Sequence, residues 1–265
     1  MKQYRIADAH AHIFPQKIAG KAVDSIGSFY GLQMTGTGLT TDLLAQGSAA
    51  GVEKFLVCST ATTPAQVESI NTFVAEECAA DSRLLGFATL HPGYADLSGE
   101  LQRVKALGLR GIKLHPDFQR FNIDDPAALA MYRLIDQAGL AVLFHTGDDR
   151  YDFSAPQRLG KVAAQFPGMV CIAAHFGGYN RWQDSVQYLG QPNVFYDTSS
   201  SLFRLSADEG AGIIQRLGDK RFFFGTDYPM WDCKGELARF MTMPLSESQR
   251  EDILWNNFAA LFTLS

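Results

Sequence analysis

The sequence predicts an α/β fold, a closed TIM-type (β/α)8 barrel, formed by one domain over residues 1–265. Eight short apolar segments alternate with helices or loops, which is typical of parallel strands covered on both faces. The length of 265 residues suits one barrel of about 250 residues. A hydrophobic content of 46% provides a sizeable core. The alternative is an open doubly wound sheet, but no GxGxxG or GxxxxGK[ST] motif follows a predicted strand.

The predicted strands are short, nearly continuous apolar runs, and the first of them leads into a histidine motif. In chain order they cover residues 4–8, 54–59, 84–89, 111–114, 141–144, 170–174, 194–196 and 221–224. Runs of this length without polar alternation indicate strands that are buried on both faces.

The predicted helices follow the strands and carry start and stop signals. They cover residues 41–50, 64–80, a segment that ends at Gly108, 126–138, 155–166, 181–189, 207–217, 236–241 and 246–258. Asp125 is expected to cap one helix, which Gly139 ends, and Ser246 with Gln249 forms a capping box for the last. The weakly patterned, Gly-rich segment 20–38 is expected to form a loop at the mouth of the barrel.

Composition limits the class of partner. The net charge of −5 provides no basic field for nucleic acid, and no apolar run approaches the roughly 20 residues that span a membrane. The N-terminus shows no signal-like segment, and the four cysteines form no CxxC pair. We therefore expect a cytoplasmic protein that acts on a small molecule, and we leave homo-oligomerisation open.

All six histidines lie at, or just past, the C-terminal end of a predicted strand. They are His10, His12, His91, His115, His145 and His175. Asp197 and Asp227 follow the seventh and eighth strands in the same way. Strand ends of this kind converge on one mouth in a (β/α)8 barrel, so these side chains are expected to meet there.

The motif Asp8-Ala-His-Ala-His12 indicates a metal site. Side chains two residues apart on a strand share a face, so His10 and His12 can bind one ion. Imidazole and carboxylate ligands suit Zn²⁺, which is the metal expected, and also Fe²⁺ or Mn²⁺. A bound metal lowers the pKa of water from 15.7 to about 7, and Asp227 could relay the proton while touching the metal.

Other polar residues near the predicted mouth have more than one interpretation. His91 precedes a proline and is expected to cap a turn, whereas His115 could be structural or bind substrate. Lys113 shares a face with His115 and is expected to hold an anionic substrate, unless it pairs with an acid or, if carboxylated, bridges two metals. Arg150 is a further candidate for binding an anion.

The ordered series of motifs resembles the amidohydrolase superfamily, in its amidohydrolase-2 branch related to aminocarboxymuconate-semialdehyde decarboxylase. The matching segments are Asp8 to His12, Gly111 to Pro116, Leu143 to Gly147, Ala174 to Gly178, Gly225 to Pro229 and the closing helix from Ile253. The resemblance implies a metal-dependent barrel in which His10, His12, His145 and Asp227 bind the metal. It also implies that His175 is a catalytic residue that orients water and substrate.

Three functions follow from this interpretation. The first is a metal-dependent hydrolase that acts on a small anionic amide, ester or lactone, with Asp227 as general base and His175 stabilising the oxyanion. The second is a metal-dependent non-oxidative decarboxylase or hydratase with the same ligands. The third, from another class, is a non-catalytic binding barrel. The superfamily's commoner chemistry favours the hydrolase.

Overall fold

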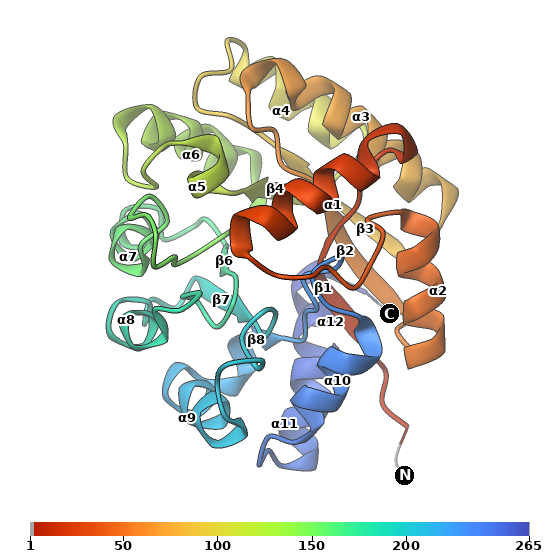
Figure 1. Ribbon diagram of the computed structural model, residues 1–265. Helices are drawn as coiled ribbons and strands as arrows, with labels where there is room; N and C mark the ends of the chain where they lie inside the picture. The colour runs from red at the N-terminus through yellow and green to blue at the C-terminus, as the bar shows by residue number, and fades with distance from the viewer. Residues whose placement is uncertain (1–2, 265) are drawn as a thin grey trace. The chain divides into compact units, whose positions relative to one another are not determined.

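The computed structural model describes residues 3–264 and confirms the predicted (β/α)8 fold (Figure 1). Hydrogen bonds join the eight strands of this part of the chain in the order β1 to β8. The strands are β1 Ala7–His12, β2 Lys54–Cys58, β3 Leu84–Thr89, β4 Gly111–Leu114, β5 Ala141–Phe144, β6 Cys171–Ala173, β7 Val194–Asp197 and β8 Phe222–Phe223.

Helices follow nearly every strand, as the sequence predicts. The α-helices are α1 Gln16–Tyr30, α2 Thr40–Ala50, α3 Val67–Ala80, α4 Leu97–Ala106, α5 Pro116–Gln119, α6 Pro126–Ala138, α7 Pro156–Gln165, α8 Trp182–Tyr188, α9 Ala207–Leu217, α10 Cys233–Met241, α11 Glu247–Glu251 and α12 Asn257–Phe262. Shorter turns are η1 Pro64–Gln66, η2 Asp219–Arg221 and the π-helical η3 Asp252–Asn256.

The chain divides into two compact units, which are described separately. The first contains residues up to Val57, the short segment Asp81–Leu84, and the chain from Asp197 onward. The second contains Cys58–Ala80 and Leu85–Tyr196. The expectation of a single domain stays a prediction.

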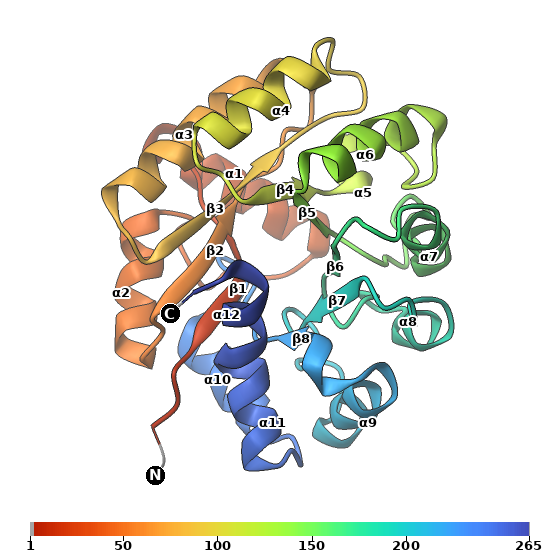
Figure 2. The same ribbon diagram turned by 180° about the vertical axis from the view of Figure 1, so that it is seen from behind.

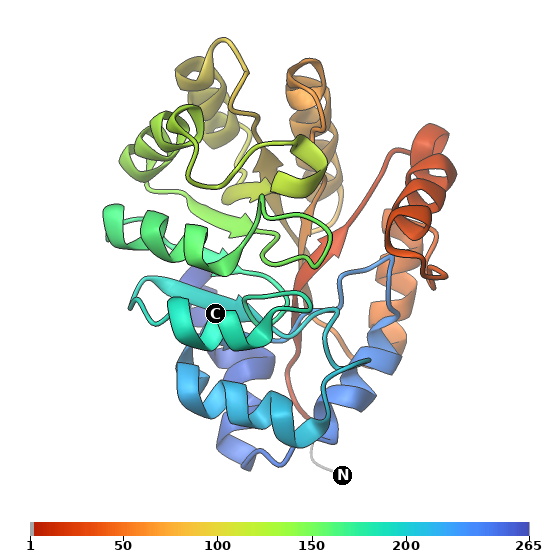
Figure 3. The same ribbon diagram turned by 60° about the vertical axis from the view of Figure 1, so that its left-hand side comes forward.

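In the first unit, the end of β8 lies beside β1. The amide of Ala9 donates to the carbonyl of Phe224 over 2.8 Å, and a parallel bridge joins Ala11 to Tyr228. Helices α2 and α10 pack against each other in this unit (Figures 1 and 3). This pairing brings the histidine motif of β1 next to the polar turn that follows β8.

In the second unit, strands β3 to β7 form a parallel ladder with helices outside it (Figure 2). Lys113 of β4 pairs with Thr89 of β3 and with Leu143 of β5. Tyr132 packs edge-on against Phe144 at 5.5 Å and against Phe166 at 6.3 Å. Burying a phenylalanine side chain contributes about 1.5–3 kcal/mol, so the contact with Phe144 helps to hold helix α6 against β5.

Two predicted boundaries were wrong at the N-terminal end. The first strand runs from Ala7 to His12 rather than over 4–8, because the turn after β8 extends the ladder: the amide of Asp227 donates to the carbonyl of His10. The predicted loop 20–38 is helical up to Tyr30. Gly27 serves close packing rather than a turn, since a Cβ there would lie 2.9 Å from the carbonyl oxygen of Leu32.

Two further elements escaped the sequence analysis. A single helical turn, α5, begins directly after His115, which caps it. The closing helix extends past 258 to Phe262 and contains the π-helical turn η3. The carbonyl of Ile253 in this turn accepts the amide of Phe224 over 2.9 Å. A π-turn frees backbone groups from the regular helical pattern, so η3 can hydrogen-bond to the end of β8.

The four cysteines are free thiols, and Cys58, Cys171 and Cys233 are buried. Burial raises the pKa of Cys78 and of Cys171 to about 12, which keeps both as thiols.

Over residues 3–264, no helix combines the length and the apolar character that crossing a membrane requires.

Candidate metal centre

Three of the predicted ligands meet in the first unit. Nε2 of His10 lies 3.2 Å from Nε2 of His12, and each of these atoms lies 3.5 Å from Oδ1 of Asp227. His10 is fully buried, and the side chains of His12 and Asp227 are 13% and 11% exposed. The alternation of side chains along β1 and the turn after β8 therefore place two imidazoles and one carboxylate around a common point.

The donor set fits a divalent metal ion. Ligand atoms bound at about 2.0–2.1 Å around a tetrahedral ion lie about 3.3–3.4 Å from one another. The three separations of 3.2, 3.5 and 3.5 Å match that spacing. Nitrogen and oxygen donors of this kind suit Zn²⁺, Mn²⁺ and Fe²⁺.

A buried carboxylate orients His10. Nδ1 of His10 lies 2.9 Å from Oδ2 of Asp197 and 3.2 Å from Oγ of Ser199. The other oxygen of Asp197 accepts the amide of Ser199 over 3.0 Å and its hydroxyl over 2.5 Å. An imidazole whose Nδ1 hydrogen points at a carboxylate keeps the lone pair on Nε2, which is the form that binds metal.

Asp8 joins β1 to the turn after β8 through three hydrogen bonds. Its Oδ1 accepts the amides of His10 and Thr226 over 3.1 and 2.9 Å, and its Oδ2 accepts the Thr226 hydroxyl over 2.6 Å. Burial raises the pKa of Asp8 to about 7, and these hydrogen bonds only partly oppose the effect. Asp8 therefore has a structural role next to the candidate ligands.

The backbone of Asp227 is left-handed, with φ of 60°. Such angles are uncommon outside glycine and cluster where a side chain must be aimed at a functional site. The amide of Met230 donates to the carbonyl of Asp227 over 2.9 Å and closes the turn. This turn directs the Asp227 carboxylate at the histidines of β1.

The second unit brings together three other predicted residues. Nδ1 of His145 lies 3.0 Å from Nε2 of His175, and the ring of His115 stacks on that of His145 with centroids 3.9 Å apart. His175 has φ of 63°, and its carbonyl accepts the indole N–H of Trp182 over 3.1 Å. Residues at the ends of β4, β5 and β6 therefore form one cluster of three histidines.

Asp117 lies beside this cluster and was missed by the sequence analysis. Its Oδ2 is 3.8 Å from Nε2 of His145, and burial raises the pKa of Asp117 to about 7. His115, Asp117 and His145 offer ligand atoms within 4.8 Å of one another. The rings of His115 and His145 are parallel to within 7°, so their in-plane lone pairs do not converge on one point. The set of His10, His12 and Asp227 in the first unit therefore suits an ion better.

Lys113 and Arg150 both lie in the second unit. Lys113 is fully buried in β4. Arg150 forms a two-point ion pair with Asp148, with Nε–Oδ1 at 2.9 Å and Nη2–Oδ2 at 2.7 Å. Two further roles stay predictions. They are metal binding by His145 and substrate contact by Lys113, His115 and Arg150. His91 caps a turn as expected, since its Nδ1 accepts the amide of Gly93 over 3.0 Å.

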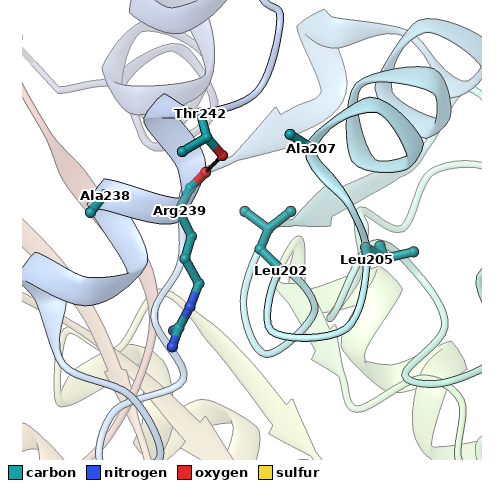
Figure 4. A pocket seen from close by; sticks show the side chains of 6 residues that line it. All are labelled: Leu202, Leu205, Ala207, Ala238, Arg239 and Thr242. Atoms are coloured by element: carbon teal, nitrogen blue, oxygen red, sulfur yellow. Dashed lines mark hydrogen bonds between the residues drawn. The ribbon is translucent and has the colours of Figure 1, made fainter.

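A pocket of about 260 Å³ lies beside α9 and α10 in the first unit (Figure 4). Its lining consists of Leu202, Leu205, Ala207, Ala238, Arg239 and Thr242. This set contains neither a histidine nor a carboxylate, so the pocket is separate from the candidate ligands.

Comparison with known proteins shows the family of the chain. The profile of a family described as Amidohydrolase matches residues 7–264. The comparison with curated proteins gave no match.

Solved structures share the fold at low sequence identity. An uncharacterised TIM-barrel protein from Bordetella bronchiseptica is 20% identical, with 98% of each chain covered and a TM-score of 0.79. A dihydroxybenzoic acid decarboxylase from Polaromonas sp. JS666, with bound manganese and the inhibitor 2-nitroresorcinol, is 18% identical over 98% of this chain and 97% of that one, with a TM-score of 0.76. The 5-carboxyvanillate decarboxylase LigW from Sphingomonas paucimobilis is 16% identical over 99% and 100%, with a TM-score of 0.75.

Proposed function

We propose a function for this chain from the premise that it belongs to the amidohydrolase family. The proposed function is that of a metal-dependent enzyme that decarboxylates a small aromatic acid without oxidation. The single observation that carries the metal dependence is the triangle of His10, His12 and Asp227. Decarboxylation is supported by structures of the same fold that are named as decarboxylases of dihydroxybenzoic acid and 5-carboxyvanillate.

The hydrolase favoured by the sequence has less support than this alternative. Hydrolysis and decarboxylation need the same metal ligands, so the ligand set does not separate them. Two of the three solved structures quoted above are named as decarboxylases, and this supports decarboxylation over hydrolysis. We therefore keep hydrolysis as an outcome of the test below.

The metal is proposed to be Mn²⁺ rather than the Zn²⁺ expected from sequence, because the Polaromonas decarboxylase contains manganese. When bound, the metal supplies a Lewis acid that withdraws electron density from substrate oxygens. His10, His12 and Asp227 would hold it, and His145 is the proposed fourth ligand. Asp197 keeps the Nε2 lone pair of His10 available through the contact at Nδ1.

The reaction also needs a proton at the carbon that loses its carboxylate. The bond between that carbon and the carboxylate breaks, carbon dioxide leaves, and the electron pair left on the carbon takes the proton. We propose that the imidazole of His175 donates this proton. Its Nε2 shares a hydrogen bond with Nδ1 of His145 over 3.0 Å. Lys113 or Arg150 is proposed to bind the anionic substrate, and His115 to pack against it.

The test is isotopic. Protein loaded with Mn²⁺ is incubated with hydroxybenzoates that carry ¹³C in the carboxyl group, and ¹³CO₂ is measured by mass spectrometry. Release of ¹³CO₂ that is lost in a His10→Ala, His12→Ala double variant is the expected result. Hydrolysis of small esters or lactones, with ¹⁸O from water entering the product and no ¹³CO₂ released, would replace the proposal by the hydrolase.

A further inference from the structure

We propose that Ser200 is a positioning residue for Asp227 and that Trp231 sets the direction of its hydrogen bond. The inference rests on the proposed function in one respect, which is that Asp227 binds the metal. It concerns residues outside the predicted ligand set. Ser200 lies in the segment after β7, and Trp231 lies just before α10.

The contacts form a short relay inside the first unit. The hydroxyl of Ser200 donates to Oδ2 of Asp227 over 2.6 Å, and the indole Nε1 of Trp231 donates to the Ser200 oxygen over 3.0 Å. Ser200 is 1% exposed, so these bonds lie away from bulk water. Asp227 thus offers Oδ1 to the histidines while Oδ2 accepts a hydrogen bond.

The chemistry of Trp231 fixes the polarity of this relay. An indole N–H donates and never accepts, so it takes a lone pair of the Ser200 oxygen and leaves the hydroxyl hydrogen for another acceptor. Two acceptors lie near that hydroxyl, Oδ2 of Asp227 at 2.6 Å and Sδ of Met230 at 3.2 Å. A carboxylate is the stronger acceptor, so Oδ2 receives the hydrogen and Asp227 is held as an acceptor-only group.

Neighbouring side chains hold Trp231 in place. The guanidinium of Arg239 lies 4.7 Å from the centre of the Trp231 ring, and the ring of Phe203 lies 5.0 Å from it. Nη1 of Arg239 also contacts Oε1 of the buried Glu236 on the same helix. Figure 4 shows the Arg239 side chain extended along the pocket beside α10, with Leu202 across from it.

A positioned carboxylate binds a metal through one defined oxygen. Losing the Ser200 hydroxyl leaves Oδ2 without this donor, so Asp227 can rotate or use both oxygens. Replacing hydrogen-bond partners of metal ligands typically lowers metal affinity about 10–100-fold. The expected effect of removing the relay is therefore on Mn²⁺ affinity and coordination, in the absence of any substrate.

The experiment compares three variants of the full chain. Ser200→Ala removes the donor to Asp227, and Trp231→Phe removes the donor to Ser200. Ser201→Ala is the matched control, because that buried hydroxyl donates to the carbonyl of Ser199 over 2.9 Å. Mn²⁺ alone is titrated by calorimetry, the Mn²⁺ spectrum is recorded by electron paramagnetic resonance, and the thermal midpoint of the metal-free protein is measured.

We expect Mn²⁺ to bind Ser200→Ala roughly tenfold more weakly or worse, with an altered spectrum. Trp231→Phe is expected to show a smaller change in the same direction, and Ser201→Ala no change. The metal-free midpoint of Ser200→Ala should match that of the control, which a merely structural role would not allow. Equal Mn²⁺ affinity and spectrum in Ser200→Ala and wild type would overturn the inference.

The outcome is distinguishable from failure of the proposed function. If wild type binds Mn²⁺ and Ser200→Ala binds it more weakly, the inference stands even when no ¹³CO₂ is released. If ¹³CO₂ is released and Ser200→Ala binds Mn²⁺ normally, the function stands and the inference fails. A wild type that binds no Mn²⁺ contradicts both.

Discussion

Nδ1 of His10 lies 2.9 Å from Oδ2 of Asp197, and both side chains are fully buried. The two residues are 187 positions apart in the sequence, one on β1 and the other at the end of β7. Their contact decides which nitrogen of His10 carries the hydrogen and therefore which is free for a metal. The orientation of this imidazole is set before any ion arrives.

Asp197→Asn should weaken the metal site without removing a ligand. An amide supports the imidazole less strongly than a carboxylate, so we expect Mn²⁺ affinity to fall about 10–100-fold. The measurement is a calorimetric titration of metal-free protein. Asp208→Asn changes an exposed carboxylate of α9 and should bind Mn²⁺ as wild type does. A Mn²⁺ affinity of Asp197→Asn equal to that of Asp208→Asn and of wild type would show that Asp197 does not support the metal site.

A double variant, His10→Ala with His12→Ala, should lose the metal and keep the fold. Both side chains lie at the end of β1, and the core layers of a barrel are separate from its mouth. Metal content by plasma mass spectrometry is expected to fall from one equivalent to background. Circular dichroism should stay as in wild type. One full equivalent retained by the folded variant would show that the ion binds elsewhere.

Gly147→Ala should destabilise the second unit far more than its backbone angle alone explains. Gly147 has φ of 80°, and a Cβ there would lie 2.6 Å from the backbone of Gly178 and Tyr179. Gly51 has the same φ of 80° with no atom within 4 Å, so Gly51→Ala isolates the cost of the angle. We expect about 1–2 kcal/mol for Gly51→Ala and about 1–3 kcal/mol more for Gly147→Ala.

Urea unfolding of the metal-free variants measures both costs. The extra cost at Gly147 arises because the loops after β5 and β6 touch there: the amide of Tyr179 donates to the carbonyl of Thr146 over 2.8 Å. Equal losses in the two variants would mean that these loops can separate at little cost.

Glu236 should make the metal-free protein less stable as pH rises. Burial raises the pKa of Glu236 to about 7, although Arg239 partly opposes this. The folded protein then keeps a proton that the unfolded chain releases near its ordinary pKa of 4.5. Between these values the folded state binds more protons, so the free energy of unfolding falls as pH increases.

The comparison is between wild type and Glu236→Gln in urea at pH 5 and pH 7.5. Asp8 and Asp117 also have pKa values raised to about 7, so wild type should lose stability across the window for several reasons. The glutamine variant should lose less. Parallel losses in the two proteins would show that Glu236 is ionised in the folded state throughout.

The sequence predicted the barrel and the positions of most of its strands because both depend on local patterns. Apolar runs located strands such as β3, β4 and β5 to the residue. The glycines of α1 were misread because Gly27 is dictated by a neighbour, Leu32, that no periodicity identifies. The π-turn near Ile253 was not predicted for the same reason, because the carbonyl of Ile253 accepts the amide of Phe224, a residue distant in the sequence.

The candidate site was predicted in part. Residue type and position after strands identified His10, His12 and Asp227, which the structure brings together. Serines and tryptophans after strands have many ordinary roles, so the contacts of Ser200 and Trp231 could not be inferred. Asp117 was missed because the single helical turn α5, which places it, carries no periodic signal.

Anomalous diffraction from a crystal soaked in Mn²⁺ tests the central claim most directly. The account predicts one strong peak within bonding distance of Nε2 of His10, Nε2 of His12 and Oδ1 of Asp227. A peak at other residues, with these three atoms bound to no ion, would contradict it.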